Sequence, residues 1–280
     1  MASTACSPGL PTVPPVSPTP TATREIGHFV WYDLLTVDLP AVLEFYGSLF
    51  GWTFDEDDNG RGVGYVTIRH QGRAIGGIVA TEDLEREVNV SQWVASLSVP
   101  DVDVAVAQVT QLGGQIVNAP QDLPNRGRTA LVRDEQGALL ALLASSSGDP
   151  AVDRTRIGSW FWTELWSRDI ESSVEFYSGL VAYDVRRVEE GSAEEYRVLD
   201  LRDIPRAGIL QYDLPQVEPN WVPYVLVDDP VALADRVEAL GGRVLIAPNP
   251  SIRNGSVALI ADPSGAALTI QKWPPEGQDR

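Results

Sequence analysis

Two acidic residues occupy equivalent positions in the two halves of the sequence. Asp33 and Glu164 each stand two residues after a tryptophan, Trp31 or Trp162, in the segments WYDLLT and WTELWS. Alternate residues of a strand point to one face, so the carboxylate and the indole should share a face. Such a carboxylate would act as a general base or bind an amine or hydroxyl, and we take Asp33 and Glu164 as candidate catalytic residues. The alternative is a structural salt bridge to an arginine such as Arg128.

Four tryptophans are candidates for ligand binding. Two of them precede the carboxylates, and the other two open the equivalent strands later in each half. They are Trp31, Trp93, Trp162 and Trp221. Large aromatic side chains can form a wall for a flat or apolar ligand, or they can fill the core. Both interpretations stay open.

These positions are equivalent because the chain is a tandem duplication. Residues 31–46 (WYDLLTVDLPAVLEFY) match residues 162–177 (WTELWSRDIESSVEFY) at an offset of 131. Residues 92–114 match 220–242, and residues 131–143 match 259–271, both at an offset of 128. A repeat of about 125 residues is the size of one domain. We therefore predict domains at 25–145 and 158–275, joined by a linker at 146–157 that is rich in Ser, Gly, Asp and Pro.

Each domain divides again into two similar units. In the first unit a strand at 28–36 precedes a helix at 39–50, with Asp38 as its N-cap and Gly51 as its stop, and three short strands follow. The second unit has a strand at 93–99, a helix at 102–112 and three more strands. A β-α-β-β-β unit leaves one sheet face uncovered, so two units should pair. The fold class is α+β: in each domain two paired units form a curved sheet with a groove.

The sequence resembles the vicinal oxygen chelate superfamily, which includes glyoxalase I, bleomycin-resistance proteins and extradiol dioxygenases. The resemblance rests on the helices DLPAVLEFYGSLFGW and DIESSVEFYSGLVAY, the two LGG helix ends, and the segments DEQGALLALL and DPSGAALTI. It covers nearly all of residues 27–273 and is closest to two-domain glyoxalase-like proteins. It implies the paired-unit fold and, in metal-dependent members, a divalent ion in the groove.

The positions where that family carries its metal ligands hold other residue types here. The family places His or Gln on the first strand of each unit and Glu on the last strand. The corresponding residues of this chain are Trp31, Val94, Ala141, Trp162, Val222 and Thr269. None is a usual ligand for a transition metal, so we predict no metal and no cofactor.

Composition restricts the partners. The net charge of −18 excludes a nucleic-acid partner, because no basic surface offsets the repulsion from phosphate. The chain has one cysteine, Cys6, and no apolar run of membrane-spanning length. Residues 1–24 are rich in Pro, Ser and Thr and should form a disordered, solvated arm. The sequence STAC around Cys6 is similar to a lipoprotein processing site, which leaves two localisations open: cytoplasmic, or a lipid-anchored protein of the cell envelope.

The leading hypothesis for function is a metal-independent protein that binds an aromatic or oxygenated small molecule, in the manner of bleomycin-resistance proteins. The first alternative is a glyoxalase-like lyase, isomerase or hydrolase that uses Asp33 or Glu164, or an unorthodox metal site. The second alternative is a non-catalytic surface or structural protein whose grooves are filled by side chains. The expected partner is a small molecule, and the chain is expected to be a monomer or a homodimer.

Overall fold

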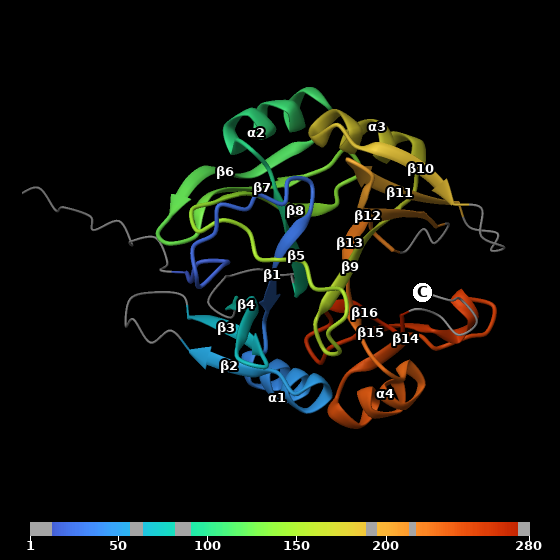
Figure 1. Ribbon diagram of the computed structural model, residues 1–280. Helices are drawn as coiled ribbons and strands as arrows, with labels where there is room; N and C mark the ends of the chain where they lie inside the picture. Colours follow the sequence, from blue (N-terminus) through green and yellow to red (C-terminus); the bar gives the residue numbers. More distant parts are fainter. Residues whose placement is uncertain (1–12, 57–63, 82–90, 189–194, 213–216, 274–280) are drawn as a thin grey trace, which may run out of the picture.

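The computed structural model describes residues 13–56, 64–81, 91–188, 195–212 and 217–273. Within them the chain forms two eight-stranded sheets, one from each half of the sequence (Figure 1). The predicted α+β fold of tandem domains with paired β-α-β-β-β units is confirmed. Cys6 lies outside the described residues.

The first domain contains two units in succession. The elements of its first unit are β1 (Phe29–Thr36), α1 (Leu39–Phe50), β2 (Thr53–Glu56), β3 (Tyr65–His70) and β4 (Arg73–Ala80). Those of its second unit are β5 (Gln92–Ser98), α2 (Val102–Gln111), β6 (Gln115–Leu123), β7 (Gly127–Arg133) and β8 (Leu139–Ser145).

The second domain repeats this order. Its first unit has β9 (Trp160–Ser167), α3 (Ile170–Val181), β10 (Asp184–Val188), β11 (Tyr196–Leu201) and β12 (Ile204–Gln211). Its second unit has β13 (Asn220–Leu226), α4 (Pro230–Val237), the short helix η1 (Glu238–Leu240), β14 (Arg243–Ile246), the short helix η2 (Arg253–Gly255), β15 (Val257–Ala261) and β16 (Ala267–Gln271).

The two units of a domain join through their first strands. The strand order is β2-β3-β4-β1-β5-β8-β7-β6 in the first sheet and β10-β11-β12-β9-β13-β16-β15-β14 in the second. β1 pairs antiparallel with β5, and β9 pairs antiparallel with β13. β1 also pairs parallel with β4, and the connection between these two strands contains α1, β2 and β3. The first strand of every unit therefore lies at the centre of a sheet.

The helices begin where an aspartate can cap them. The carboxylate of Asp38 accepts a hydrogen bond from the backbone N–H of Ala41, as predicted, and Asp101, Asp169 and Asp229 cap the other three helices in the same way. Gly51 ends α1 in the left-handed conformation, with φ of 69°. Among the described residues, no helix combines the length and apolarity needed to cross a membrane.

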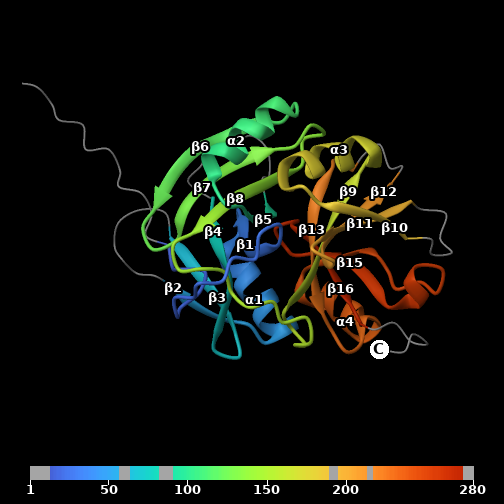
Figure 2. The same cartoon turned by 45° about the horizontal axis from the view of Figure 1, so that its top comes forward.

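The two domains share one core between their sheets. α2 lies beside α3, and α1 lies beside α4, so helices of different domains pair at both ends of the molecule (Figures 1 and 2). Aromatic rings from both domains meet in the centre. The ring centroid of Trp160 lies 4.9 Å from that of Trp93 and 5.1 Å from that of Trp52, and the centroids of Phe29 and Trp221 are 4.5 Å apart. Because the inner faces are buried together, the opposite faces of both sheets are left to form the grooves.

Residues 13–17 of the N-terminal arm pack against the first domain instead of lying in solvent. Val16 is 0% exposed and contacts a cluster that includes Trp31 and Leu143. The backbone N–H of Thr21 donates a 2.7 Å hydrogen bond to the carbonyl of Ser147. The prediction of a solvated arm is therefore wrong for residues 13–17, which are buried or half-buried, whereas residues 18–24 are exposed. Composition alone did not indicate this packing, because the burial of a few valines is enough to hold an arm against a domain.

Candidate functional site

The first groove contains a hydrogen-bonded cluster around Asp33. Oδ1 of Asp33 accepts hydrogen bonds from Nε1 of Trp31 at 3.0 Å and from the hydroxyl of Tyr65 at 2.6 Å. Nη2 of Arg126 donates to the same hydroxyl at 2.9 Å, and Nη1 lies 3.7 Å from Oδ2 of Asp33. The Arg126 guanidinium also stacks over the Trp31 ring at 4.5 Å. The carboxylate is thus fixed in orientation by three side chains.

Local structure explains how these residues meet. Trp31 and Asp33 alternate along β1 onto the groove face, and Tyr65 begins β3, two strands away. Gly77 on β4 lies between them, and a Cβ atom there would collide with the Tyr65 hydroxyl. Glycine is therefore required for the tyrosine to reach the carboxylate. Arg126 comes from the turn between β6 and β7.

Burial keeps the tyrosine protonated. The pKa of Tyr65 is raised far above its usual value, first by burial and then by the negative charge of Asp33. A neutral phenol donates one hydrogen bond, and here that bond goes to Oδ1 of Asp33. No hydrogen bond joins Oδ2 to any described residue, and the charged group beside it is Nη1 of Arg126 at 3.7 Å.

A cavity of about 220 Å³ lies beside this cluster. The Asp33 side chain is 23% exposed and forms part of its wall. The rest of the wall is largely apolar, with amide groups on the side of β6. The lining includes Val13, Leu35, Val79, Val94, Asn118, Gln121, Leu131 and Ala141. The first groove therefore offers one oriented carboxylate within an apolar enclosure.

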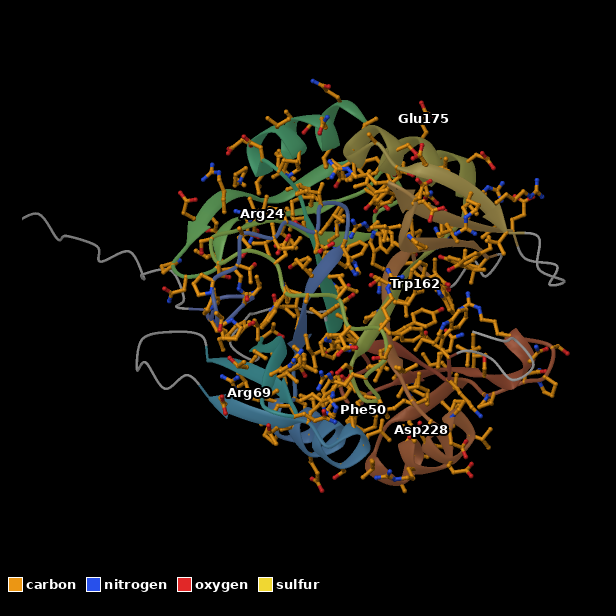
Figure 3. The ribbon with its side chains drawn as sticks, viewed as in Figure 1. Arg24, Phe50, Arg69, Trp162, Glu175 and Asp228 are labelled. Carbon is orange, nitrogen blue, oxygen red and sulfur yellow. The ribbon has the colours of Figure 1, made fainter. Side chains whose placement is uncertain are left out.

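The second groove contains a similar cluster of Trp, Tyr, Arg and carboxylate side chains, but its carboxylate is less exposed than Asp33. Nε1 of Trp162 donates to the hydroxyl of Tyr196 at 3.0 Å, as Trp31 does to Tyr65 (Figure 3 labels Trp162). Oε2 of Glu164 accepts from Nη2 of Arg253 at 2.6 Å, and Oε1 accepts from the hydroxyl of Tyr224 at 2.5 Å.

The Glu164 side chain is 0% exposed, and both of its oxygens are used. The same side of the sheet carries a cluster of buried apolar residues that includes Trp166, Tyr212, Val222 and Leu259. The longer carboxylate is thus sealed into an ion pair, whereas Asp33 still faces a cavity. The two grooves keep the same residue types but differ in what a ligand could reach.

The other two predicted tryptophans lie on the opposite side of the sheets. Trp93 and Trp221 are each 1% exposed, and their indoles donate to the hydroxyls of Tyr46 and Tyr177 in the shared core. Strand alternation gives the reason: each precedes the groove-facing valine by one residue, so it points to the other face. Neither lines a groove, and we do not propose them as ligand contacts.

The arginine partner of Asp33 also differs from the one suggested by sequence. Arg128 forms ion pairs with Asp103 and Asp122 on the surface, while Arg126, two residues earlier, reaches the groove. Sequence comparison missed Tyr65, Tyr196, Arg126 and Arg253. The tyrosines share the offset of 131 and could have been found, but the arginines are 127 residues apart and fall outside both offsets.

The residues at the family's metal positions do not fit a metal ion. In the first groove they are Trp31, whose indole N–H can only donate, and the apolar Val94 and Ala141. No group of three or more His, Cys, Asp or Glu side chains suited to a metal occurs among the residues placed by the structure. The donor set therefore gives no support for the divalent ion of metal-dependent relatives.

Known proteins resemble this chain in sequence over most of its length. A family model described as "Glyoxalase/Bleomycin resistance protein/Dioxygenase superfamily" matches residues 25–142. The protein named "Putative glyoxylase CFP32" of Mycobacterium tuberculosis is 31% identical over 88% of this chain and 95% of its own length. The anthracycline biosynthesis protein DnrV of Streptomyces peucetius is 28% identical over 87% of this chain and 92% of its own.

Solved structures share the fold at low sequence identity. The Mn(II)-bound glyoxalase of Novosphingobium aromaticivorans has a TM-score of 0.58 and 15% identity, covering 89% of this chain and 83% of that one. A variant of homoprotocatechuate 2,3-dioxygenase from B. fuscum has a TM-score of 0.60 and 14% identity, covering 98% of this chain and 75% of that one. At such identities the likeness extends to the fold alone.

Proposed function

The chain belongs to the glyoxalase/bleomycin resistance protein/dioxygenase superfamily, and from that premise we propose that its first domain binds a small organic molecule without a metal. One observation carries this proposal: the Asp33 side chain faces a cavity with largely apolar walls, and its Oδ2 accepts no hydrogen bond from the described residues. The absence of metal-ligand side chains at Trp31, Val94 and Ala141 supports metal independence.

The chemistry of the wall specifies the ligand. An oriented carboxylate selects a hydrogen-bond donor, either a hydroxyl or an amine, and the apolar walls select a hydrocarbon or aromatic body. The cavity of about 220 Å³ is smaller than the sites of about 300–1,000 Å³ that hold drug-sized ligands. We therefore propose a ligand, or an enclosed ligand portion, of one or two rings. The similarity to proteins of anthracycline biosynthesis agrees with an aromatic hydroxylated ligand.

The arm helps to enclose this ligand site. Val13 lines the cavity, and Nε of Arg126 donates a 2.8 Å hydrogen bond to the carbonyl of Pro14. The arm thus engages the same arginine that approaches Asp33. In the proposed function, Val13 forms part of the wall of the site and limits the size of the ligand.

A matched pair of variants tests the proposal. Catechol and benzylamine serve as probes, with affinity measured by calorimetry. Asp33→Asn keeps the shape but removes the charge, and we expect affinity for the probe that binds to fall about tenfold or more. Asp103→Asn, which breaks a surface ion pair in the same domain, should leave affinity unchanged. Equal affinities of wild type and D33N would refute the role of Asp33.

Catalysis by Asp33 is the second candidate function. The carboxylate is oriented by Tyr65 and faces a cavity, which is the arrangement of a general base, and Arg126 would stabilise negative charge that develops nearby. The similarity to a protein named as a glyoxylase favours a lyase or isomerase reaction. Incubation with methylglyoxal and glutathione, followed by NMR, would test it. Product formation that is lost in D33N would support catalysis.

The second domain fits the structural alternative. Its carboxylate is buried in an ion pair with Arg253, and buried apolar side chains form a cluster on the same side of the sheet. We propose that this half supports the first domain through the shared core and binds no ligand through Glu164.

A further inference from the structure

A second cavity, of about 380 Å³, lies where the arm and the linker meet the first strands of both domains. It is a different cavity from the one beside Asp33, and its wall includes Val16–Thr19 and Thr21 on the arm, Pro150–Asp153 on the linker, and the beginnings of β1 and β9. Its volume falls within the range of about 300–1,000 Å³ that is typical of ligand sites. We call it the junction cavity.

Both histidines of the chain line the junction cavity. His28 is 5% exposed and His70 is 7% exposed, and Nδ1 of each is buried without a hydrogen-bond partner among the described residues. Nε2 of His70 contacts the carbonyl of Ile157 at 2.8 Å, whereas the His28 ring makes no hydrogen bond to the described residues. Buried polar nitrogens are normally paired, so two unpaired ones on one cavity indicate a missing partner.

The surroundings of His28 are electropositive. The pKa of His28 is lowered to about 3, first by burial and then by the positive charges of Arg154 and Arg206. Arg73, exposed on the cavity wall, forms no ion pair with any described residue. Arg156 on the same wall is already paired with Asp153 at 2.9 Å. Arg206 is itself paired with Glu25 at 2.7 Å, so Arg73 is the cation on the cavity wall that has no ion pair to a described residue, and it favours an anion there.

The opposite part of the wall is apolar and aromatic. The Trp160 ring packs against Tyr32 with the ring centroids 4.7 Å apart and the planes tilted by 36°, and its indole N–H is already used in a 2.8 Å bond to the carbonyl of Ile75. With its N–H satisfied, the indole offers a ligand only its apolar surface.

We propose that the junction cavity binds a small organic anion, in which a carboxylate is held by Arg73 and His28 and a flat apolar body lies along Ile75 and Trp160. The neutral His28 ring supplies one N–H donor, and Arg73 supplies a charged donor. This site goes beyond the function proposed for the first groove, because it uses another cavity and a ligand of opposite charge, although Trp31 lines this cavity and also donates to Asp33.

NMR of the histidine rings tests the proposal directly, since the chain has only two histidines and both line the cavity. The probe is 2-naphthoate, added to the full chain labelled with ¹⁵N-histidine. Saturable shifts of the His28 and His70 signals would support the site. A folded protein whose histidine signals stay fixed up to about 5 mM probe would overturn it.

Two controls establish the anion chemistry. Arg73→Gln should weaken naphthoate binding about tenfold, whereas Arg243→Gln, an exposed arginine on β14 with no ion pair to the described residues, should not. The neutral analogue 2-naphthalenemethanol should also bind about tenfold more weakly. Equal affinities of R73Q and R243Q, or of the acid and the alcohol, would refute the proposal. Failure here leaves the Asp33 test untouched, because its probes carry no carboxylate.

Discussion

The hydroxyl of Tyr46 in the first domain donates a 2.9 Å hydrogen bond to Oδ2 of Asp262 in the second domain, 216 residues later. The relationship is reciprocal: Tyr177 of the second domain donates to Oδ2 of Asp134 in the first, also at 2.9 Å. Each tyrosine in turn accepts from an indole of its own domain, Trp93 or Trp221. The two domains are thus joined by matched Trp–Tyr–Asp chains inside the shared core.

These aspartates make stability depend on pH. Burial, and then the charge of Glu135, raises the pKa of Asp134 from 3.8 to about 6, and the pKa of Asp262 is also raised. The folded state therefore binds this proton more tightly than the unfolded state. The resulting stabilisation is complete below about pH 4 and is lost as pH rises through about 6.

We expect the free energy of unfolding of wild type to fall by on the order of 3 kcal/mol relative to that of Asp134→Asn as the pH rises from 4 to 7. Urea unfolding at several pH values measures this difference. Asp184→Asn, at an exposed carboxylate, is the control, and its free energy of unfolding should change with pH in the same way as that of wild type. Parallel curves for wild type and D134N would contradict the expectation.

Gly77 should resist substitution because Tyr65 occupies the space of a side chain. We expect Gly77→Ala to destabilise the protein by about 1–3 kcal/mol through overpacking. Tyr65→Ala removes the colliding ring and its hydroxyl, so the double variant should be less destabilised than the sum of the two single variants. Thermal denaturation measures all three. Gly64→Ala, which meets nothing within 4 Å, is the control. Simple additivity would show that the collision is not the cause.

The arm should be anchored by Val16. Val16→Ala is expected to cost about 1–3 kcal/mol in arm docking, because a fully buried side chain is truncated. Hydrogen exchange is the measurement: the amides of Ser17 and Thr21, which bond to Ser147, should exchange faster. Val37→Ala, at an exposed valine, should leave both amides unchanged. Unaltered exchange in V16A would mean that other contacts hold the arm.

Replacing Arg253 in the second groove should destabilise the protein more than replacing Arg126 in the first. Arg253→Met leaves Glu164 buried without its ion-pair partner, and we expect a loss of about 3–5 kcal/mol that Glu164→Gln partly restores in the double variant. Arg126→Met should cost less, because Asp33 is partly solvated and keeps two other donors. Chemical denaturation compares the variants. Equal losses for R253M and R126M would contradict the difference in burial.

Much of the architecture could be predicted because it repeats along the chain. The duplicated segments and the helical spacing after Asp38 located the units, and the pairing of units followed from their uncovered faces. The candidate site was harder. Trp31 and Asp33 were found from strand alternation, but Arg126 and Arg253 lie in loops of different length, where no periodic pattern exists.

The sequence by itself determined the repeated units, the caps of the helices and the residue types on each strand, because these depend on local spacing. Only the tertiary structure decided which face of each sheet became core, and so sent Trp93 and Trp221 inward. It also decided that Asp33 faces a cavity while Glu164 is sealed, since the filling of a groove depends on segments distant in the chain. The arm shows the same dependence: its composition favours solvent, yet the groove of the first domain binds it through Val16 and Pro14.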